Sequence, residues 1–161
     1  MKIARGLALA ALLAMLGVAS AQLKPPGPST PQLPPSPTEL QRTEAQSSKE
    51  LAARGAAEKW LALLDAGEYG KAWDGCAQLF RQRVTRQQWV ESLPQTRSPF
   101  GKMKERRNEV ATYKTSLPGA PDGEYVTVRF GTKFEKKDDV EELLTLVLEA
   151  GVWRPTGYSI R

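Results

Sequence analysis

The chain has no histidine and only one cysteine, Cys76, among its 161 residues. Without histidine, Ser-His-Asp hydrolysis and the usual histidine-containing zinc sites are excluded. A catalytic cysteine also usually needs a basic partner, most often histidine, and one cysteine cannot form an intramolecular disulfide. The sequence therefore predicts no metal site and no cofactor, and Cys76 is interpreted as a small buried apolar residue rather than a reactive thiol.

Long apolar runs are also missing, except at the N-terminus. Lys2 and Arg5 precede the apolar stretch GLALAALLAMLGVA, which leads to an A-x-A end at Ala21. This pattern is typical of a secretory signal peptide over residues 1–21, and the apolar run is shorter than the ~20 residues that span a bilayer. No cysteine follows the expected cleavage site. We therefore expect an exported protein, periplasmic or secreted, without a lipid anchor.

Proline is concentrated in one place. Seven of the twelve prolines lie between Pro25 and Pro37, and five of them recur at every third residue. Polyproline II has three residues per turn, so the segment is interpreted as a stiff spacer; a ligand for a P-x-x-P-binding domain is the alternative. The spacer and a polar lead-in, expected to be a frayed helix, occupy residues 22–47. A single domain over residues 48–161 follows.

The domain begins with apolar residues at helical spacing. A first helix is predicted over residues 48–66 with Gly67 as its C-terminal cap, and a second over residues 68–82. A third helix begins with a capping box at Thr85 and runs to about Leu93 or slightly beyond, because Pro94 and Pro99 discourage a long continuation. The stripes of the first two helices consist of Ala53, Ala56, Ala57, Trp60, Leu61 and Leu64, and of Tyr69, Ala72, Trp73, Cys76 and Phe80.

After Gly101 the apolar period changes from 3.6 to 2, which predicts strands. The four strands are expected over about residues 104–116, 124–134, 140–149 and 151–161. In the last strand, Val152, Tyr158 and Ile160 share one face and Trp153 and Pro155 the other, and Pro155 indicates an edge position or a bulge. The predicted fold class is therefore α+β, with about three N-terminal helices packed on a curved four-stranded antiparallel sheet.

Several blocks of this domain look like successive parts of one exported bacterial family. The blocks are AAEKWLALLDAGEYGKAWDGCAQLFR, VTRQQWVESL, RSPFG, LPGAPDGEYV and GVWRPTGY. Over about residues 52–160 the chain resembles the family known as domain of unknown function 4019, which implies no activity and no cofactor. The order of elements also resembles the nuclear-transport-factor-2-like (NTF2-like) cone. That resemblance implies a cup between the helices and the concave sheet face, but it gives no function.

The cup provides the candidate ligand-binding residues, Trp60, Trp73 and Tyr158. A cofactor-free lyase or isomerase would also need an inward acid with a raised pKa. For every acid near the apolar stripes, a solvated position is the favoured interpretation; one of the pair in the third strand facing inward is the alternative. These acids are Asp65, Glu68, Asp74, Glu141 and Glu142.

Partners are suggested by two further features. Residues 81–107 contain eight basic and two acidic residues, which suggests a face for an anionic envelope component, with a solvated surface as the favoured alternative. Leu143 and Val147 suggest a homodimer through the outer sheet face. No nucleic-acid partner is expected, because no binding motif is present.

The favoured function is therefore a non-catalytic binding or protein-interaction module of the cell envelope. A small-ligand binder and a cofactor-free lyase or isomerase are the alternatives, and both would use the cup.

Overall fold

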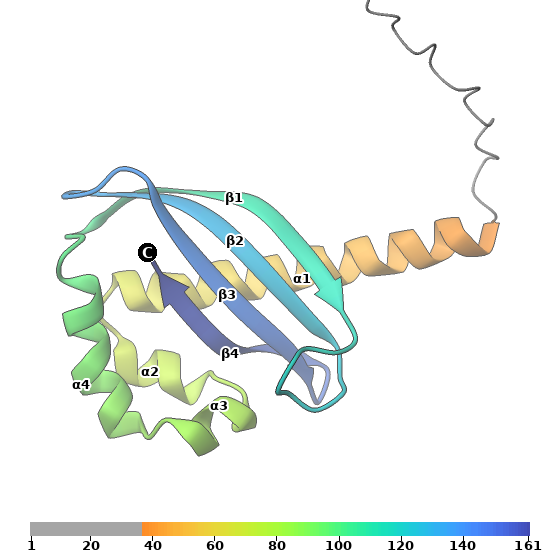
Figure 1. Cartoon of the computed structure of the whole chain (residues 1–161), viewed down its shortest axis with the longest axis horizontal. Coiled ribbons are helices and arrows are strands. Elements are labelled where there is room, and N and C mark those ends of the chain that lie inside the picture. Colours follow the sequence, from red (N-terminus) through yellow and green to blue (C-terminus); the bar gives the residue numbers. More distant parts are fainter. Residues whose placement is uncertain (1–36) are drawn as a thin grey trace, which may run out of the picture. The chain divides into compact units, whose positions relative to one another are not determined.

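The computed structural model describes residues 37–161, which form N-terminal helices packed on an open four-stranded antiparallel sheet (Figure 1). The predicted α+β class is confirmed. The expected signal peptide and most of the proline-rich spacer lie outside the described residues. The elements are α1 (Pro37–Asp65), α2 (Tyr69–Asp74), α3 (Gln78–Arg83), α4 (Arg86–Arg97), β1 (Met103–Lys114), β2 (Tyr125–Phe134), β3 (Val140–Glu149) and β4 (Val152–Ile160). Among the described helices, none is long and apolar enough to cross a membrane.

Helix α1 is longer than the sequence predicted. The polar lead-in continues the same helix, and its exposed residues 37–48 extend beyond the sheet (Figure 1). The predicted cap at Gly67 is confirmed: Gly67 N donates to Leu64 O at 3.1 Å and Glu68 N to Leu63 O at 2.8 Å. Gly67 has φ +73°, a conformation that glycine adopts without a Cβ penalty.

The expected second helix is wrong as one element, because it divides into α2 and α3. Ala77 has an extended backbone at ψ 152°, and its N–H donates to Pro155 O at 2.8 Å instead of continuing the helix. This bond joins the turn to β4. Cys76 lies in the turn and is buried, as predicted, with its Sγ 3.3 Å from Ala72 O. Burial raises the pKa of its thiol to about 12, so Cys76 is not a reactive thiolate.

Helix α4 confirms its predicted start and extends past its predicted end. Thr85 Oγ1 accepts from Gln88 N at 3.2 Å and Thr85 N donates to Gln88 Oε1 at 3.0 Å, the reciprocal bonds of a capping box. The helix continues through Pro94 to Arg97. Trp89, Leu93 and Arg97, four residues apart, are the buried residues of α4. The extra turn therefore places Arg97 on the buried side of the helix.

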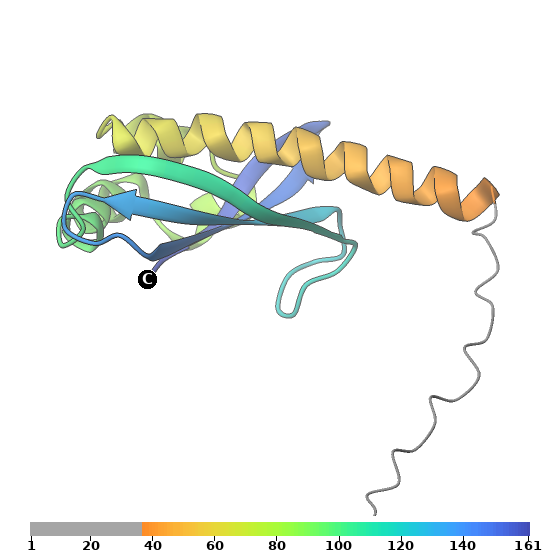
Figure 2. The ribbon, with the colours of Figure 1, turned by 90° about the horizontal axis from the view of Figure 1, so that it is seen from above.

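The strands follow one another in the order β1-β2-β3-β4, each antiparallel to its neighbour. Helix α1 lies on one face of the sheet, and the loop between β1 and β2 projects from the other face (Figure 2). The predicted period of 2 is confirmed in β2, since its alternate apolar residues are fully buried with two leucines of β3. These residues are Val126, Val128, Phe130, Phe134, Leu144 and Leu146.

Strand β4 contains an irregularity that changes which side chains face the helices. Leu144 pairs with Tyr158, but Leu146 pairs with Pro155, so β4 has one extra residue at this point. Pro155 indicated an edge position or a bulge, and both are found: β4 is an edge strand and has a bulge beside Pro155. The predicted separation of Trp153 from Tyr158 is wrong: the bulge restores both side chains to the helix side, where they pack on the core.

Candidate functional site

Aromatic side chains fill much of the space between the helices and the sheet. The rings of Trp60 and Tyr158 lie 5.6 Å apart, Trp60 and Trp89 5.9 Å apart, and Phe80 and Trp89 5.2 Å apart. Trp60 is only 4% exposed and donates from Nε1 to Ala72 O at 2.8 Å. Packed rings of this kind contribute mainly to the core.

At one end of this layer, four charged side chains meet from four different elements. Asp65 ends α1, Arg97 ends α4, Arg106 lies on β1 and Glu142 lies on β3. Each arginine contacts both carboxylates, so the four residues form a closed ring of two acids and two bases. We refer to Asp65, Arg97, Arg106 and Glu142 as the buried charge cluster.

The geometry of the buried charge cluster is that of direct hydrogen-bonded ion pairs. Arg97 donates from Nη1 to Glu142 Oε1 at 2.9 Å and from Nη2 to Asp65 Oδ1 at 2.6 Å. Arg106 donates from Nε to Glu142 Oε2 at 2.7 Å and from Nη1 to Asp65 Oδ2 at 2.6 Å. The side chains of Asp65, Arg106 and Arg97 are 15%, 10% and 8% exposed, and that of Glu142 is fully buried. Charges this buried require such partners.

Two hydroxyl groups complete the environment of Glu142. Thr132 Oγ1 donates to Oε2 at 2.7 Å, and Tyr158 Oη donates to Oε1 at 2.6 Å. Tyr158 Oη also accepts from Arg97 Nη1 at 2.6 Å. Both oxygens of Glu142 therefore accept two hydrogen bonds each.

These partners determine the ionisation of the site. Burial alone would raise the pKa of Glu142, but the positive charge of Arg106 and the bonds from Tyr158, Arg106 and Thr132 outweigh it, so the pKa is lowered. Burial and the negative charge of Glu142 raise the pKa of Tyr158. At neutral pH the pair is thus a carboxylate beside a neutral phenol. A general acid would need the opposite shift at Glu142.

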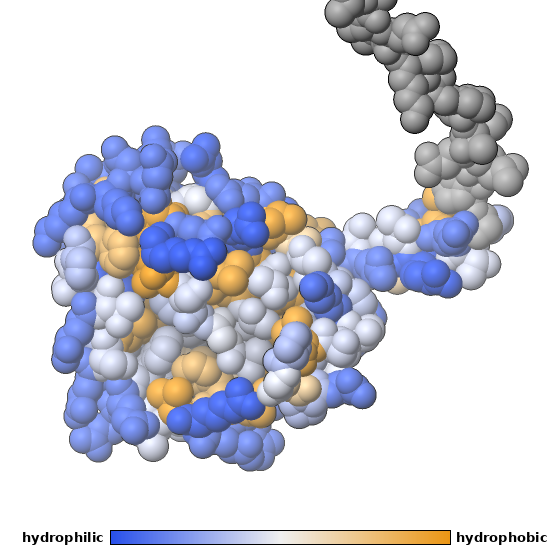
Figure 3. Space-filling model, viewed as in Figure 1, coloured by the Kyte–Doolittle hydropathy of each residue, from blue (hydrophilic) through white to orange (hydrophobic). Residues whose placement is uncertain are grey.

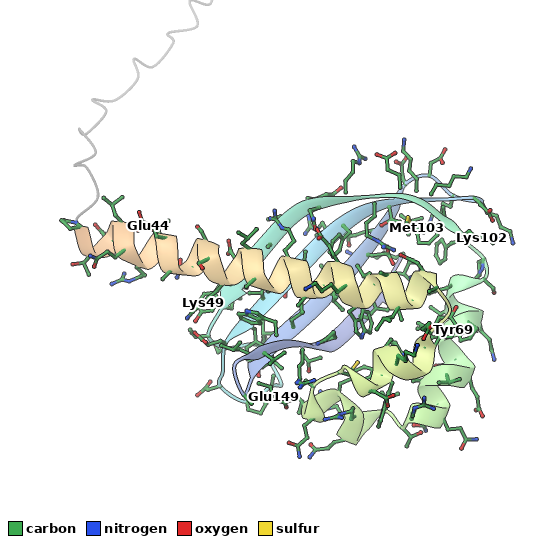
Figure 4. The ribbon with its side chains drawn as sticks, turned by 180° about the vertical axis from the view of Figure 1, so that it is seen from behind. Glu44, Lys49, Tyr69, Lys102, Met103 and Glu149 are labelled. Carbon is green, nitrogen blue, oxygen red and sulfur yellow. The ribbon has the colours of Figure 1, made fainter. Side chains whose placement is uncertain are left out.

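Next to the buried charge cluster lies an open cleft of about 400 Å³. Asp65 and Arg97 belong to both. Figure 4 shows Tyr69, Lys102 and Met103 near the C-terminal end of α1, where this cleft opens. The cleft is lined by Leu64, Asp65, Tyr69, Pro94, Arg97, Ser98, Gly101, Lys102, Met103, Glu135 and Lys136.

The three predicted ligand contacts are not part of this cleft lining. Trp60 and Tyr158 pack in the aromatic core, and half-buried Trp73 donates from Nε1 to Val84 O at 2.8 Å. Their contact with a ligand stays a prediction.

The solvated position favoured for the five predicted acids is wrong for two of them, Asp65 and Glu142. Glu142 is the inward-facing member of the strand pair, and Asp65 joins it in the buried charge cluster. The other three acids lie nearer solvent and pair with bases at the surface. Their pairs are Glu68–Lys71 at 2.5 Å, Asp74–Arg86 at 3.3 Å and Glu141–Arg161 at 2.6 Å.

Sequence reasoning did not identify the two arginines of the site. For Arg97 a usable indication exists, because it follows Trp89 and Leu93 at the spacing of one helix face. For Arg106 the sequence gives none: the residues around it in β1 are polar, and only its pairing with Thr132 on β2 directs the arginine to the cluster. Residues 81–107 therefore do not form one exposed basic face, since two of their eight basic side chains are buried.

The sheet face away from α1 is mixed in character. Leu143 and Val147 are half-buried there, while Val110 and Val152 are 42% and 50% exposed. Figure 3, which views this face, shows apolar areas separated by polar side chains. The homodimer through this face stays a prediction.

Within residues 37–161, no group of three or more His, Cys, Asp or Glu side chains is arranged to hold a metal ion.

Residues 56–158 match the profile of a family described as protein of unknown function, DUF4019. Because this match covers more than half of the chain, the protein belongs to that family. None of the curated proteins compared with the chain matches it.

Proposed function

For this member of a family of unknown function, we propose the role of an exported, non-catalytic binding module that holds a small ligand in the cleft beside the buried charge cluster. Export is supported by the pattern of residues 1–21. The binding role is supported by the cleft itself, whose volume of about 400 Å³ lies in the range of small-molecule sites.

The observation that carries the non-catalytic role is the pairing of Glu142. A lyase or isomerase of the kind considered above needs an inward acid that exchanges a proton near neutral pH. Glu142 faces inward, but two arginines and two hydroxyl groups hold it as a carboxylate. A carboxylate whose two oxygens each accept two hydrogen bonds stabilises the local structure and does not transfer protons. We therefore assign the buried charge cluster the task of fixing the cleft wall.

The resemblance to the NTF2-like cone is part of the same proposal. Helices followed by a sheet, with α1 on one sheet face, agree with that arrangement. In a cone of that kind the ligand would occupy the cup. Here aromatic rings occupy much of the cup, so we place the ligand at the cleft near its charged end.

The proposal is tested by native mass spectrometry of the chain, expressed with all 161 residues in a bacterium and purified from the periplasm. We expect a protein that begins at residue 22 and carries a small-molecule adduct. The variant Ser98→Trp should lose the adduct, because Ser98 is an exposed residue that lines the cleft. Ser116→Trp, in the exposed β1–β2 loop, is the matched control and should retain it.

Two results would count against the proposal. A chain found in the cytoplasm with residues 1–21 still attached would contradict export. An adduct retained by Ser98→Trp, or no adduct after gentle purification at any protein concentration, would contradict ligand binding at the cleft.

A further inference from the structure

We infer that the cleft takes an organic anion, a carboxylate or phosphate group carried on a short apolar body. This inference rests on the proposed function, since it names the ligand class of the same site.

The first observation is an unused donor on a buried arginine. Arg97 is only 6% exposed and lines the cleft. Its Nη1 and Nη2 atoms donate to Glu142, Tyr158 and Asp65, but its Nε donates to no atom of residues 37–161. The fully buried side-chain atoms without a partner in this range are Arg54 Nε and Trp89 Nε1, so Arg97 Nε is within reach of solvent. A guanidinium group can only donate hydrogen bonds, so the Nε–H of Arg97 is available to an acceptor on a ligand.

The second observation is the charge of the lining. Within the buried charge cluster two arginines balance two carboxylates, so the cluster itself favours neither sign. The remaining charged lining residues are Lys102, Lys136 and Glu135. Glu135 Oε2 accepts from Lys102 N at 3.1 Å, and within residues 37–161 Lys136 Nζ donates only to Ser98 O, at 3.4 Å. Outside the cluster the lining thus carries two ammonium groups and one carboxylate, a net charge of +1, which favours an anion over a cation.

The third observation is the apolar part of the same lining. Leu64, Tyr69, Pro94 and Met103 line the cleft together with these charged groups. An inorganic anion would leave the parts of these side chains that line the cleft in contact with water, whereas a short alkyl or aryl group would cover them. The ligand that uses both parts is a small amphiphilic anion.

The inference is tested by NMR titration of the ¹⁵N-labelled protein, residues 22–161, with hexanoate and with hexyl phosphate. The Nε–Hε signal of Arg97 and the amide signals of Lys102 and Met103 should shift and saturate with one or both compounds. The compound that binds more tightly identifies the headgroup of the ligand as a carboxylate or a phosphate. Hexanamide, acetate and inorganic phosphate should each bind at least about tenfold more weakly, because each loses one part of the recognition.

A charge variant supplies the second readout. Lys102→Gln combined with Lys136→Gln should weaken hexanoate or hexyl phosphate binding several-fold, and should change hexanamide binding little. Lys104→Gln combined with Lys114→Gln, at two exposed positions of β1, is the matched control and should leave binding unchanged.

The outcomes separate the ligand class from the function. Equal or tighter binding of hexanamide or hexylammonium at the cleft would overturn the anion and leave a binding module with another ligand. Signals that do not move with any of these compounds, together with a protein free of adduct in the periplasmic preparation, would overturn both. Saturation that shifts other signals but not Arg97 Nε–Hε would overturn the assigned site.

Discussion

Two groups of side chains lie near different parts of α1, and each consists of a glutamate, a tyrosine and a base. In the first group, Tyr158 Oη donates to Glu142 at 2.6 Å, and Arg97 donates to both of them. In the second, Tyr113 Oη donates to Glu124 at 2.7 Å, and Lys49 donates to both of them. The chemistry of the partners is nearly the same, but the access of solvent is not.

The difference lies in burial and in the base that is used. The Glu142 side chain is fully buried, whereas those of Glu124 and Lys49 are 33% and 36% exposed. A buried carboxylate must find every partner within the protein, and the planar fork of an arginine can serve two carboxylates at once. A carboxylate at the surface completes its hydration with water, so a single lysine suffices. The comparison shows that a more buried carboxylate has more hydrogen-bond partners within the protein, whereas the type of partner changes less.

The largest effect should come from breaking the buried group. Glu142→Ala leaves Arg97 and Arg106 with one carboxylate between them, and we expect a loss of about 3–5 kcal/mol in the free energy of unfolding. Glu141→Ala is the matched control, because Glu141 is the next residue in β3 and pairs with Arg129 and Arg161 nearer the surface. Urea unfolding followed by circular dichroism measures both. Equal losses in the two variants would show that the cluster contributes nothing special.

The second effect concerns pH. The pKa of Glu142 is lowered in the folded state, so its ionised form stabilises the fold fully above its ordinary pKa of 4.5, and this contribution is lost as the pH falls through the lowered value. Glu142→Gln cannot ionise. The stability gap between the wild type and Glu142→Gln should therefore be constant from pH 7 to about pH 5 and narrow at lower pH. Urea midpoints measured down to pH 3 test this, and a gap of constant width throughout would refute the assigned ionisation.

Much of the fold was predictable because it depends on neighbours in the sequence. The cap at Gly67, the capping box at Thr85 and the alternation of β2 each arise within a few residues, and all three are confirmed. The bulge in β4 was only indicated by Pro155. Its consequence for Trp153 and Tyr158 requires the register against β3, which the sequence does not state.

The candidate site was predictable only in part, for a related reason. Glu142 as an inward acid was one of two choices in an apolar strand, and Asp65 was singled out only as a residue near the cap. Their partner Arg97 lies 45 residues from Glu142 in the sequence, on the last turn of a helix expected to end before it. A ring formed by four elements depends on how those elements pack, so local patterns cannot predict it.

The third effect compares the two hydroxyl groups. Tyr158→Phe removes a donor to Glu142 and an acceptor for Arg97 without a large change in volume, and we expect a loss of about 1–3 kcal/mol. Tyr113→Phe makes the same deletion near the surface, where water replaces the hydroxyl, so its loss should be smaller. Thermal unfolding of both variants measures the difference. A larger loss in Tyr113→Phe would mean that burial does not explain the comparison.

The smallest effect belongs to the exposed ion pair, and salt sharpens it. Glu124→Gln removes the charge that Lys49 contacts, yet the shift in unfolding midpoint should be well below that of Tyr158→Phe, because exposed pairs are weak. The shift should shrink further between low and about 1 M NaCl, since the Debye length falls to about 3 Å. The shift caused by Glu142→Ala should change less with salt, because Glu142 is fully buried and its ion pairs with Arg97 and Arg106 are direct hydrogen bonds. If both shifts respond to salt alike, the buried charge cluster is no better shielded than the exposed pair, and the rigid cleft wall inferred from it is no longer tenable.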